Sequence, residues 1–151
     1  MIVRIKRLDQ TLPLPEYHTD GAAAFDLYSR EDTVIAPREI KLLPSNLIIE
    51  VPAGHFLMIA PRSSTAKKKS LIIPNSPGVI DADYHGPDDE IHIQVYNFSD
   101  APVEVKRGER IAQGIIMPIV RAEWEEVSEI NAPNRGGFGS TGGYHEGDKL
   151  S

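Results

Sequence analysis

A stretch that could do chemistry lies just past the middle of the chain, where two glycines bracket two carboxylates and an aromatic ring in Gly78-Val79-Ile80-Asp81-Ala82-Asp83-Tyr84-His85-Gly86. Apolar residues flank it at 71–73 and again at 91, 93 and 95. This pattern predicts two packed strands that meet in a tight connection. A carboxylate held between packed strands suits the positioning of one water molecule. A surface turn with solvated aspartates is the alternative interpretation.

Two polar groups elsewhere in the chain suit the binding of phosphate. Arg62-Ser63-Ser64 offers a guanidinium fork, two hydroxyls and consecutive backbone N–H groups, and such a set binds phosphate oxygens. A polar turn is the alternative interpretation of these residues. Gln113 lies in an otherwise apolar run at 111–115, where its amide needs hydrogen-bond partners from the fold or from a ligand.

Residues 132–151 are rich in glycine and poor in apolar residues, so we expect a mobile tail without a core of its own. The tail nevertheless combines an arginine, an aromatic ring and two hydroxyls, which together describe an anion clamp with an aromatic lid: Arg135, Phe138, Ser140 and Thr141. It is not a P-loop, because the sequence has neither the Lys-Ser/Thr ending nor the strand–loop–helix frame.

The elements that must position these residues are short segments rich in apolar or β-branched residues, most of them closed by proline or glycine. We expect strands at 2–6, 22–29, 33–37, 39–44, 47–52, 56–60, 91–96, 103–105 and 111–120. No segment carries a convincing helical stripe, although 61–69 leaves room for one short helical turn. The pattern predicts an all-β sandwich or barrel over residues 1–131. Asp26, inside one expected strand, needs a partner or a role.

Composition narrows the class of protein. The chain has 151 residues and no cysteine, so a disulfide framework and a thiolate metal site are excluded. Its net charge of −6 argues against broad nucleic-acid binding, which needs a basic face. No apolar run approaches the ~20 residues of a membrane helix, and the alternating start does not resemble a signal peptide. We therefore expect a soluble cytoplasmic protein with no nucleic-acid or membrane partner.

Five stretches, taken in order, resemble the motifs of one family, the trimeric dUTPases (deoxyuridine triphosphate nucleotidohydrolases). The resemblance covers nearly the whole chain, and it rests on Ala24-Phe25-Asp26-Leu27, Pro61-Arg62-Ser63-Ser64-Thr65-Ala66, the 78–86 stretch, Gly108-Glu109-Arg110-Ile111-Ala112-Gln113, and Arg135-Gly136-Gly137-Phe138-Gly139-Ser140-Thr141-Gly142.

The resemblance implies a jelly-roll β-fold and a homotrimer with three active sites between subunits. It also implies hydrolysis of dUTP to dUMP and pyrophosphate, with Mg²⁺ on the triphosphate. That activity limits uracil in DNA and supplies dUMP for dTMP synthesis. The 132–151 tail of one subunit is expected to close over a site formed by two others.

The resemblance also implies a role for each matched residue. Asp81 falls on the catalytic carboxylate, which holds a water and accepts its proton as the water attacks the α-phosphorus. Tyr84 falls where an aromatic ring packs against the deoxyribose and excludes a 2′-hydroxyl. The uracil-reading residues are Asn75 and the backbone of Gly78, Val79 and Ile80.

Phosphate binding is implied for Arg62, Ser63, Ser64 and Gln113, and for Arg135, Gly139, Ser140 and Thr141 of the tail. Phe138 is expected to stack over the uracil. Asp26 falls on a first-motif aspartate that supports the metal region through water. Asp83 and the remaining histidines outside the motifs, among them His18, are interpreted as structural or surface residues.

Three features depart from the family's pattern. His85 stands where many members have arginine or glutamine, and we interpret it as structural. Pro87-Asp88-Asp89 looks like an insertion that lengthens a loop beside the site. Lys67-Lys68-Lys69 is more basic than usual, which predicts a solvated face or the steering of a polyphosphate.

Two other functions compete with dUTP hydrolysis. A dCTP deaminase, or a bifunctional dCTP deaminase and dUTPase, has the same fold and similar phosphate motifs. That family needs a glutamate immediately before the closing glycine of the central stretch, and the chain has His85 there. A non-catalytic nucleotide-binding β-barrel would be favoured if Asp81 or the tail motif were lost, and both are present.

Overall fold

The computed structural model describes residues 1–136. The chain divides into two compact units, Met1–Val120 and Arg121–Ser151. Every strand and helix of the described residues belongs to the first unit. No helix in residues 1–136 is long and apolar enough to cross a membrane.

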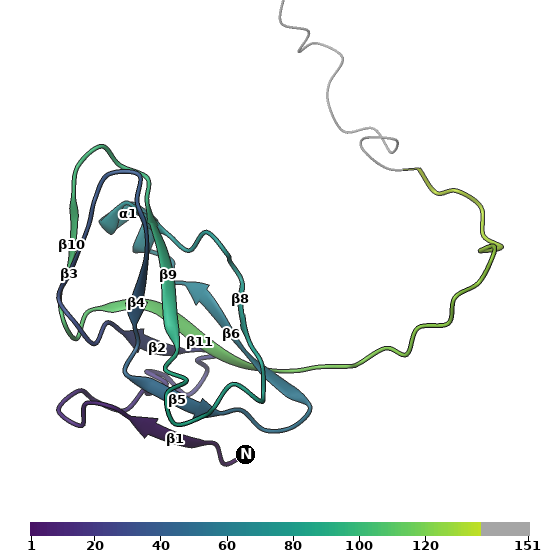
Figure 1. Ribbon diagram of the computed structural model, residues 1–151, viewed down its shortest axis with the longest axis horizontal. Helices are drawn as coiled ribbons and strands as arrows, with labels where there is room; N and C mark the ends of the chain where they lie inside the picture. Colours follow the sequence, from purple (N-terminus) through teal and green to yellow (C-terminus); the bar gives the residue numbers. More distant parts are fainter. Residues whose placement is uncertain (137–151) are drawn as a thin grey trace, which may run out of the picture. The chain divides into compact units, whose positions relative to one another are not determined.

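The first unit is built almost entirely of short strands (Figure 1). The strands are β1 (Arg4–Arg7), β2 (Phe25–Tyr28), β3 (Thr33–Ile35), β4 (Ile40–Pro44), β5 (Leu47–Glu50), β6 (His55–Pro61), β7 (Leu71–Ile72), β8 (Gly78–Ile80), β9 (His92–Asn97), β10 (Val103–Val105) and β11 (Arg110–Pro118). The single helix, α1 (Thr65–Lys69), confirms the helical turn expected within 61–69. It ends where Ser70 takes a left-handed conformation with φ of 53°.

The strands pair into four antiparallel sheets. The largest has the order β2-β11-β6-β8, and a second has the order β4-β9-β7. Two ribbons, β1-β5 and β10-β3, complete the unit. Most neighbours in a sheet are distant in the sequence, as in a jelly roll, so the expectation of an all-β jelly-roll fold is confirmed.

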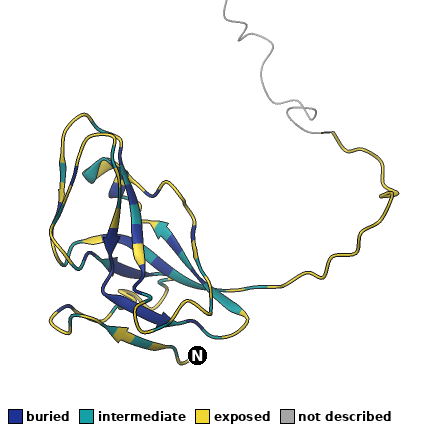
Figure 2. Ribbon diagram, in the orientation of Figure 1, coloured by how far each residue is buried: buried dark blue, intermediate teal, exposed yellow. Residues whose placement is uncertain are grey.

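One hydrophobic core lies between these sheets, and in several strands alternate residues point into it. In β9, for example, Ile93 and Val95 are fully buried, whereas His92 is exposed. Figure 2 shows the buried segments following β4, β5 and β9 through the unit. The core also takes in Leu27, Ile35, Leu43, Leu57, Leu71, Val105 and Ile111.

The stretch between β7 and β9 differs from the expected tight connection. β7 and β9 do pair, with Ile72 opposite Tyr96, but between them the chain crosses to the other sheet and forms β8 beside β6. A Cβ at Gly78 would lie 3.1 Å from the Ile59 Cβ, so glycine allows the close approach of the two strands. The strand expected at 22–29 is also shorter, because only Phe25–Tyr28 pairs.

Candidate active site

The predicted site residues form two groups that strand β6 holds apart. β8 runs antiparallel to β6, with Gly78 opposite Ile59 and Ile80 opposite Leu57. Asp81 therefore lies beside the beginning of β6, whereas Arg62 follows its end. At ~3.3 Å per residue along a strand, the two residues are on the order of 20 Å apart. One chain by itself does not bring the predicted catalytic carboxylate to the predicted phosphate-binding residues.

The first group, which we call the β8 group, surrounds the connection after β8. Asp81, Asn75 and Val79 are exposed, whereas Gly78 is buried. The Asp81 carbonyl accepts a hydrogen bond from the Tyr84 N–H at 3.2 Å, which closes a turn. The group therefore presents an exposed carboxylate, an amide and a strand edge on one short segment.

Tyr84 is partly exposed and tied back to the chain that follows it. Its hydroxyl donates to the backbone carbonyl of Glu90 at 3.2 Å. His85 makes a local contact, with Nδ1 at 2.7 Å from the Ala82 carbonyl. This contact is consistent with the structural role predicted for His85, because it fixes the imidazole to its own turn.

The second group, the Asp26 group, is centred on a buried carboxylate in β2. Asp26 Oδ1 accepts from Arg62 Nε at 2.8 Å, and Oδ2 lies 3.1 Å from Arg110 Nη1. His18 Nε2 lies 2.9 Å from the same Oδ2. The Asp26 side chain is only 9% exposed. The partners expected for this buried carboxylate are therefore three basic side chains. Asp26 in turn fixes the orientation of these side chains.

An irregularity in β11 brings Arg110 into this group. Gln113 pairs with Asp26 and Arg110 pairs with Tyr28, with a register shift between Arg110 and Ala112. Residues three apart normally point to opposite faces of a strand. The extra residue of the β-bulge puts Arg110 and Gln113 on the same face, beside Asp26.

The other predicted phosphate-binding residues lie around the end of β6. Gln113 Nε2 donates to the Pro61 carbonyl at 3.0 Å, which supplies the partner that its amide requires. Ser64 precedes α1 without a side-chain hydrogen bond to the helix N-terminus, and Ser63 is exposed. Arg62 thus contacts Asp26, Gln113 pairs with it across the sheet, and Ser63 and Ser64 follow Arg62 directly in the chain.

Sequence reasoning missed two members of the Asp26 group. Arg110 stands within a matched motif, and its place three residues before Gln113 could have drawn attention to it. His18 carries no ligand spacing and was interpreted as a surface or structural residue. The structure places it between Asp26 and Glu16, whose Oε1 is 3.4 Å from His18 Nδ1, and these contacts agree with a structural role.

The surrounding charges also affect Tyr28. Its pKa is raised by burial and by the negative charges of Asp26 and Glu16. The phenol therefore stays protonated at neutral pH and keeps a donor beside the Asp26 group.

Of the predicted tail residues, only Arg135 lies within residues 1–136. Arg135 is exposed and belongs to the second unit. Phe138, Gly139, Ser140 and Thr141 lie outside the described residues. Their predicted contacts with nucleotide stay predictions.

A metal role for Asp26 fits only as an indirect one. Within residues 1–136 no group of three or more histidine, aspartate or glutamate side chains could hold a metal ion. Both Asp26 oxygens already accept from basic side chains. A remaining lone pair can accept from a metal-bound water, whereas direct coordination would compete with the arginines.

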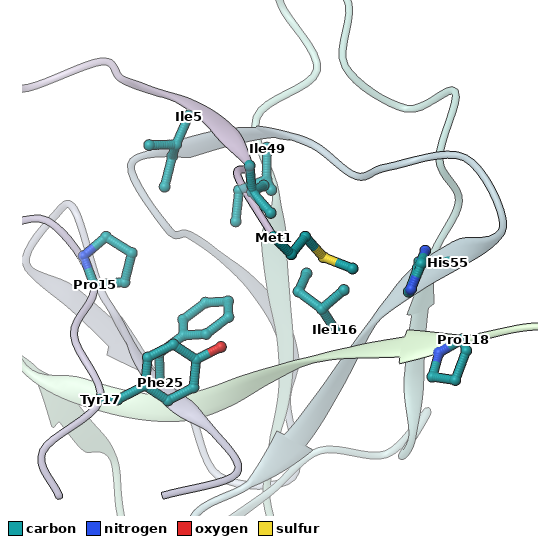
Figure 3. Close-up of a pocket in the computed structure, with 10 residues that line it drawn as sticks. Met1, Ile5, Pro15, Tyr17, Phe25, Ile49, His55, Ile116 and Pro118 are labelled. Atoms are coloured by element: carbon teal, nitrogen blue, oxygen red, sulfur yellow. The ribbon is translucent and has the colours of Figure 1, made fainter. Parts of the chain in front are cut away.

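An apolar groove of about 520 Å³ lies on another part of the unit (Figure 3). Tyr17 and Phe25 line it edge to face, with ring centroids 5.7 Å apart. The groove also includes Met1, Ile5, Ile49, Ile116 and Pro118. It contains none of the predicted site residues, and its lining has no carboxylate, lysine or arginine. This groove therefore does not suit a triphosphate.

Comparison with known proteins identifies the family of the chain, over a range that includes both groups. The family model described as dUTPase matches residues 10–142. The chain belongs to the dUTPase family. That match includes all five motifs of the sequence, from the Asp26 stretch to the tail.

Relatives within the dUTPase family match along almost their whole length. The deoxyuridine 5′-triphosphate nucleotidohydrolase of Nautilia profundicola is 45% identical over 144 residues, covering 94% of this chain and 99% of the relative. The enzyme of the same name from Dictyoglomus turgidum is 43% identical, covering 93% and 97%.

Solved dUTPase structures have the same fold. The dUTPase of Staphylococcus bacteriophage 80alpha with dUPNHPP superimposes with a TM-score of 0.83 at 26% identity, covering 93% of this chain and 98% of that one. The dUTPase of Streptococcus mutans gives 0.73 at 33% identity, covering 80% and 98%.

Proposed function

We propose that the protein hydrolyses dUTP to dUMP and pyrophosphate, which limits uracil in DNA and supplies dUMP for dTMP synthesis. The observation that carries this proposal is the dUTPase family match over residues 10–142. The full-length relatives named for dUTP hydrolysis support it. The bacteriophage relative binds the nucleotide analogue dUPNHPP, which supports a nucleotide substrate here.

Asp81 is the proposed general base. Its carboxylate is exposed, so it can hold a water molecule and take its proton during attack on the α-phosphorus. General-base assistance of this kind contributes ~10²–10⁴ in rate. The rest of the acceleration comes from orientation and from donors around the phosphates.

The base and the sugar are read by the β8 group. Asn75 and the backbone of residues 78–80 supply an amide and a strand edge that can match the uracil edge. Cytosine presents a different donor pattern and would leave polar groups unpaired, at roughly 1–3 kcal/mol each. Tyr84 packs against the deoxyribose and leaves no room for a 2′-hydroxyl.

The phosphates are held by the Asp26 group together with the tail. Arg62 and Arg110 carry the positive charge, and Ser63, Ser64 and Gln113 add neutral donors. Mg²⁺ bound to the triphosphate would neutralise part of its charge. Asp26 would contact that ion only through water, since Mg²⁺ bound to phosphates usually keeps several water ligands.

The active form is proposed to be a homotrimer whose sites lie between subunits. The ~20 Å between Asp81 and Arg62 along β6 supports this, because a triphosphate is much shorter than that separation. The β8 group of one subunit and the Asp26 group of another would then share one nucleotide.

Steady-state assays with dUTP, dCTP, dTTP and UTP in the presence of Mg²⁺ test the reaction. Pyrophosphate release from dUTP is expected, and Asp81→Asn should lower kcat by ~10²–10⁴ with little change in nucleotide affinity. Ammonia release from dCTP would instead favour the deaminase. Tight binding without either product would favour a binding module.

Mixing two inactive variants tests the shared site. Asp81→Asn and Arg62→Ala proteins, unfolded together and refolded at equal amounts, should regain activity, because some sites then combine an intact Asp81 with an intact Arg62. Random assembly of a closed ring gives about a quarter of the wild-type sites. No recovery in correctly assembled mixtures would contradict sites between subunits.

A further inference from the structure

A hydrogen bond between Tyr84 and Glu90 spans the loop that leads from Asp81 to β9. The Tyr84 side chain is partly exposed, and its hydroxyl donates to the Glu90 carbonyl at 3.2 Å. This bond holds the far end of the phenol ring, whereas Cβ holds the near end. The angle of the ring therefore depends on where the Glu90 backbone lies.

The Glu90 side chain is itself fixed by a partly buried ion pair with Arg30. The residue is 6% exposed, and its carboxylate accepts from Arg30 Nε at 2.9 Å and Nη2 at 3.0 Å. Oε1 also accepts from the Asn46 N–H at 2.7 Å. A bidentate pair of this kind sets orientation as well as distance, so the Glu90 backbone has little freedom to move.

Residues 86–89 close into a turn of their own. The Gly86 N–H donates to Asp89 Oδ2 at 2.6 Å, and the Asp89 N–H donates to the Gly86 carbonyl at 3.2 Å. Lys6 Nζ donates to the Pro87 carbonyl at 3.3 Å, which joins the turn to β1. This turn lies between Tyr84 and Glu90, whose hydrogen bond spans it.

We infer that the Arg30–Glu90 ion pair is a positioning unit for Tyr84, so that these two residues help to set the preference for deoxyribonucleotides over ribonucleotides without touching the nucleotide. The inference rests on the proposed function, which puts the Tyr84 ring against the sugar. A ring held at both ends excludes the 2′-hydroxyl by its shape, whereas a ring held only at Cβ can tilt and admit it.

The first test removes the hydroxyl and keeps the ring. Tyr84→Phe should lower the ratio of kcat/KM for dUTP to that for UTP by about three- to tenfold, the effect of one lost hydrogen bond. Most of the change should come from faster hydrolysis of UTP. Tyr96→Phe removes a phenol hydroxyl from β9, outside this loop, and should leave the ratio unchanged.

The second test acts through the ion pair. Glu90→Gln keeps the side-chain volume but loses the charge pair with Arg30, and it should lower the same ratio. Because both substitutions free the same ring, the Tyr84→Phe/Glu90→Gln double variant should change the ratio by less than the product of the single effects. A purely structural role for Glu90 would instead reduce hydrolysis of both nucleotides equally.

Folding of each variant is checked by its thermal melt before kinetics. A folded Glu90→Gln protein with an unchanged ratio would overturn the inference. If Glu90→Gln does not fold, an unchanged ratio in Tyr84→Phe is by itself enough to overturn the inference. If the wild-type protein does not hydrolyse dUTP in the steady-state assay, the proposed function fails. That result is separate from an unchanged dUTP/UTP ratio in an active enzyme, which overturns only this inference.

Discussion

Replacing Asp26 with asparagine should separate the electrostatic role of this residue from its shape. The substitution preserves side-chain volume but removes the charge that Arg62 approaches at 2.8 Å and Arg110 at 3.1 Å. One amide oxygen can still accept a hydrogen bond, whereas the new NH₂ group faces cationic donors. Asp26→Asn should therefore weaken both the fold and the alignment of the two guanidinium groups.

The structure sets the size of the effect on stability. Breaking a fully buried ion pair costs about 3–5 kcal/mol, because the remaining charge is left without a partner. Here the carboxylate is 9% exposed, but the Arg62 and Arg110 side chains are 28% and 44% exposed. Water can solvate the released arginines, so the expected loss is on the order of 1–3 kcal/mol.

Urea denaturation measures this loss, and steady-state kinetics measures the effect on the substrate. The midpoint should fall without a change in m-value, and KM for dUTP should rise because Arg62 and Arg110 lose their common anchor. Asp9→Asn is the matched control. Asp9 forms an ion pair with Arg107, at 2.5 Å, that lies outside the candidate site. This substitution should change the midpoint only slightly and leave KM unaltered. Wild-type stability and KM in Asp26→Asn would refute the reasoning.

Two further predictions concern the strand that carries Gln113 and the tail. Gly114→Ala should destabilise the protein by about 1–3 kcal/mol, because the new Cβ would lie 2.6 Å from Phe25 Cζ and 3.1 Å from Leu57 Cδ1; an unchanged urea midpoint would contradict it. Deleting residues 132–151 should leave the melting temperature nearly unchanged, because the core described in residues 1–136 ends at Ala112 apart from the packed Ile116. The same deletion should abolish most dUTP turnover, and a collapse of the melting temperature would show that the tail stabilises the fold.

The positions of most strands could be predicted because proline and glycine separate short apolar runs. β8 could not, because three residues are too few to show a period, and its pairing with β6 depends on the close approach at Gly78. Strand pairing in this fold joins residues that are far apart in the sequence, as with β1 and β5. Local patterns do not contain that information.

The sequence pointed to Asp26 and Arg62 as candidate site residues, but not to Arg110 or His18, and it did not predict how the two groups are arranged. A buried aspartate demands partners, and this drew attention to Asp26 correctly. The identity of those partners depends on the bulge before Ala112 and on the path of residues 13–24, which carry His18. The division into two distant groups follows from the register of β6 and β8, which the sequence does not reveal.

Strand β6 also decides where the protein can tolerate changes of length. Removing one residue between His55 and Pro61 would move Arg62 by ~3.3 Å and turn the following side chains to the opposite face. By contrast, the turn at 86–89 closes on its own hydrogen bonds and leaves the strands on either side in register. Libraries that vary loop length should therefore target 87–89 and keep 55–61 constant, because the length of 55–61 sets the position of Arg62 and the length of 87–89 does not.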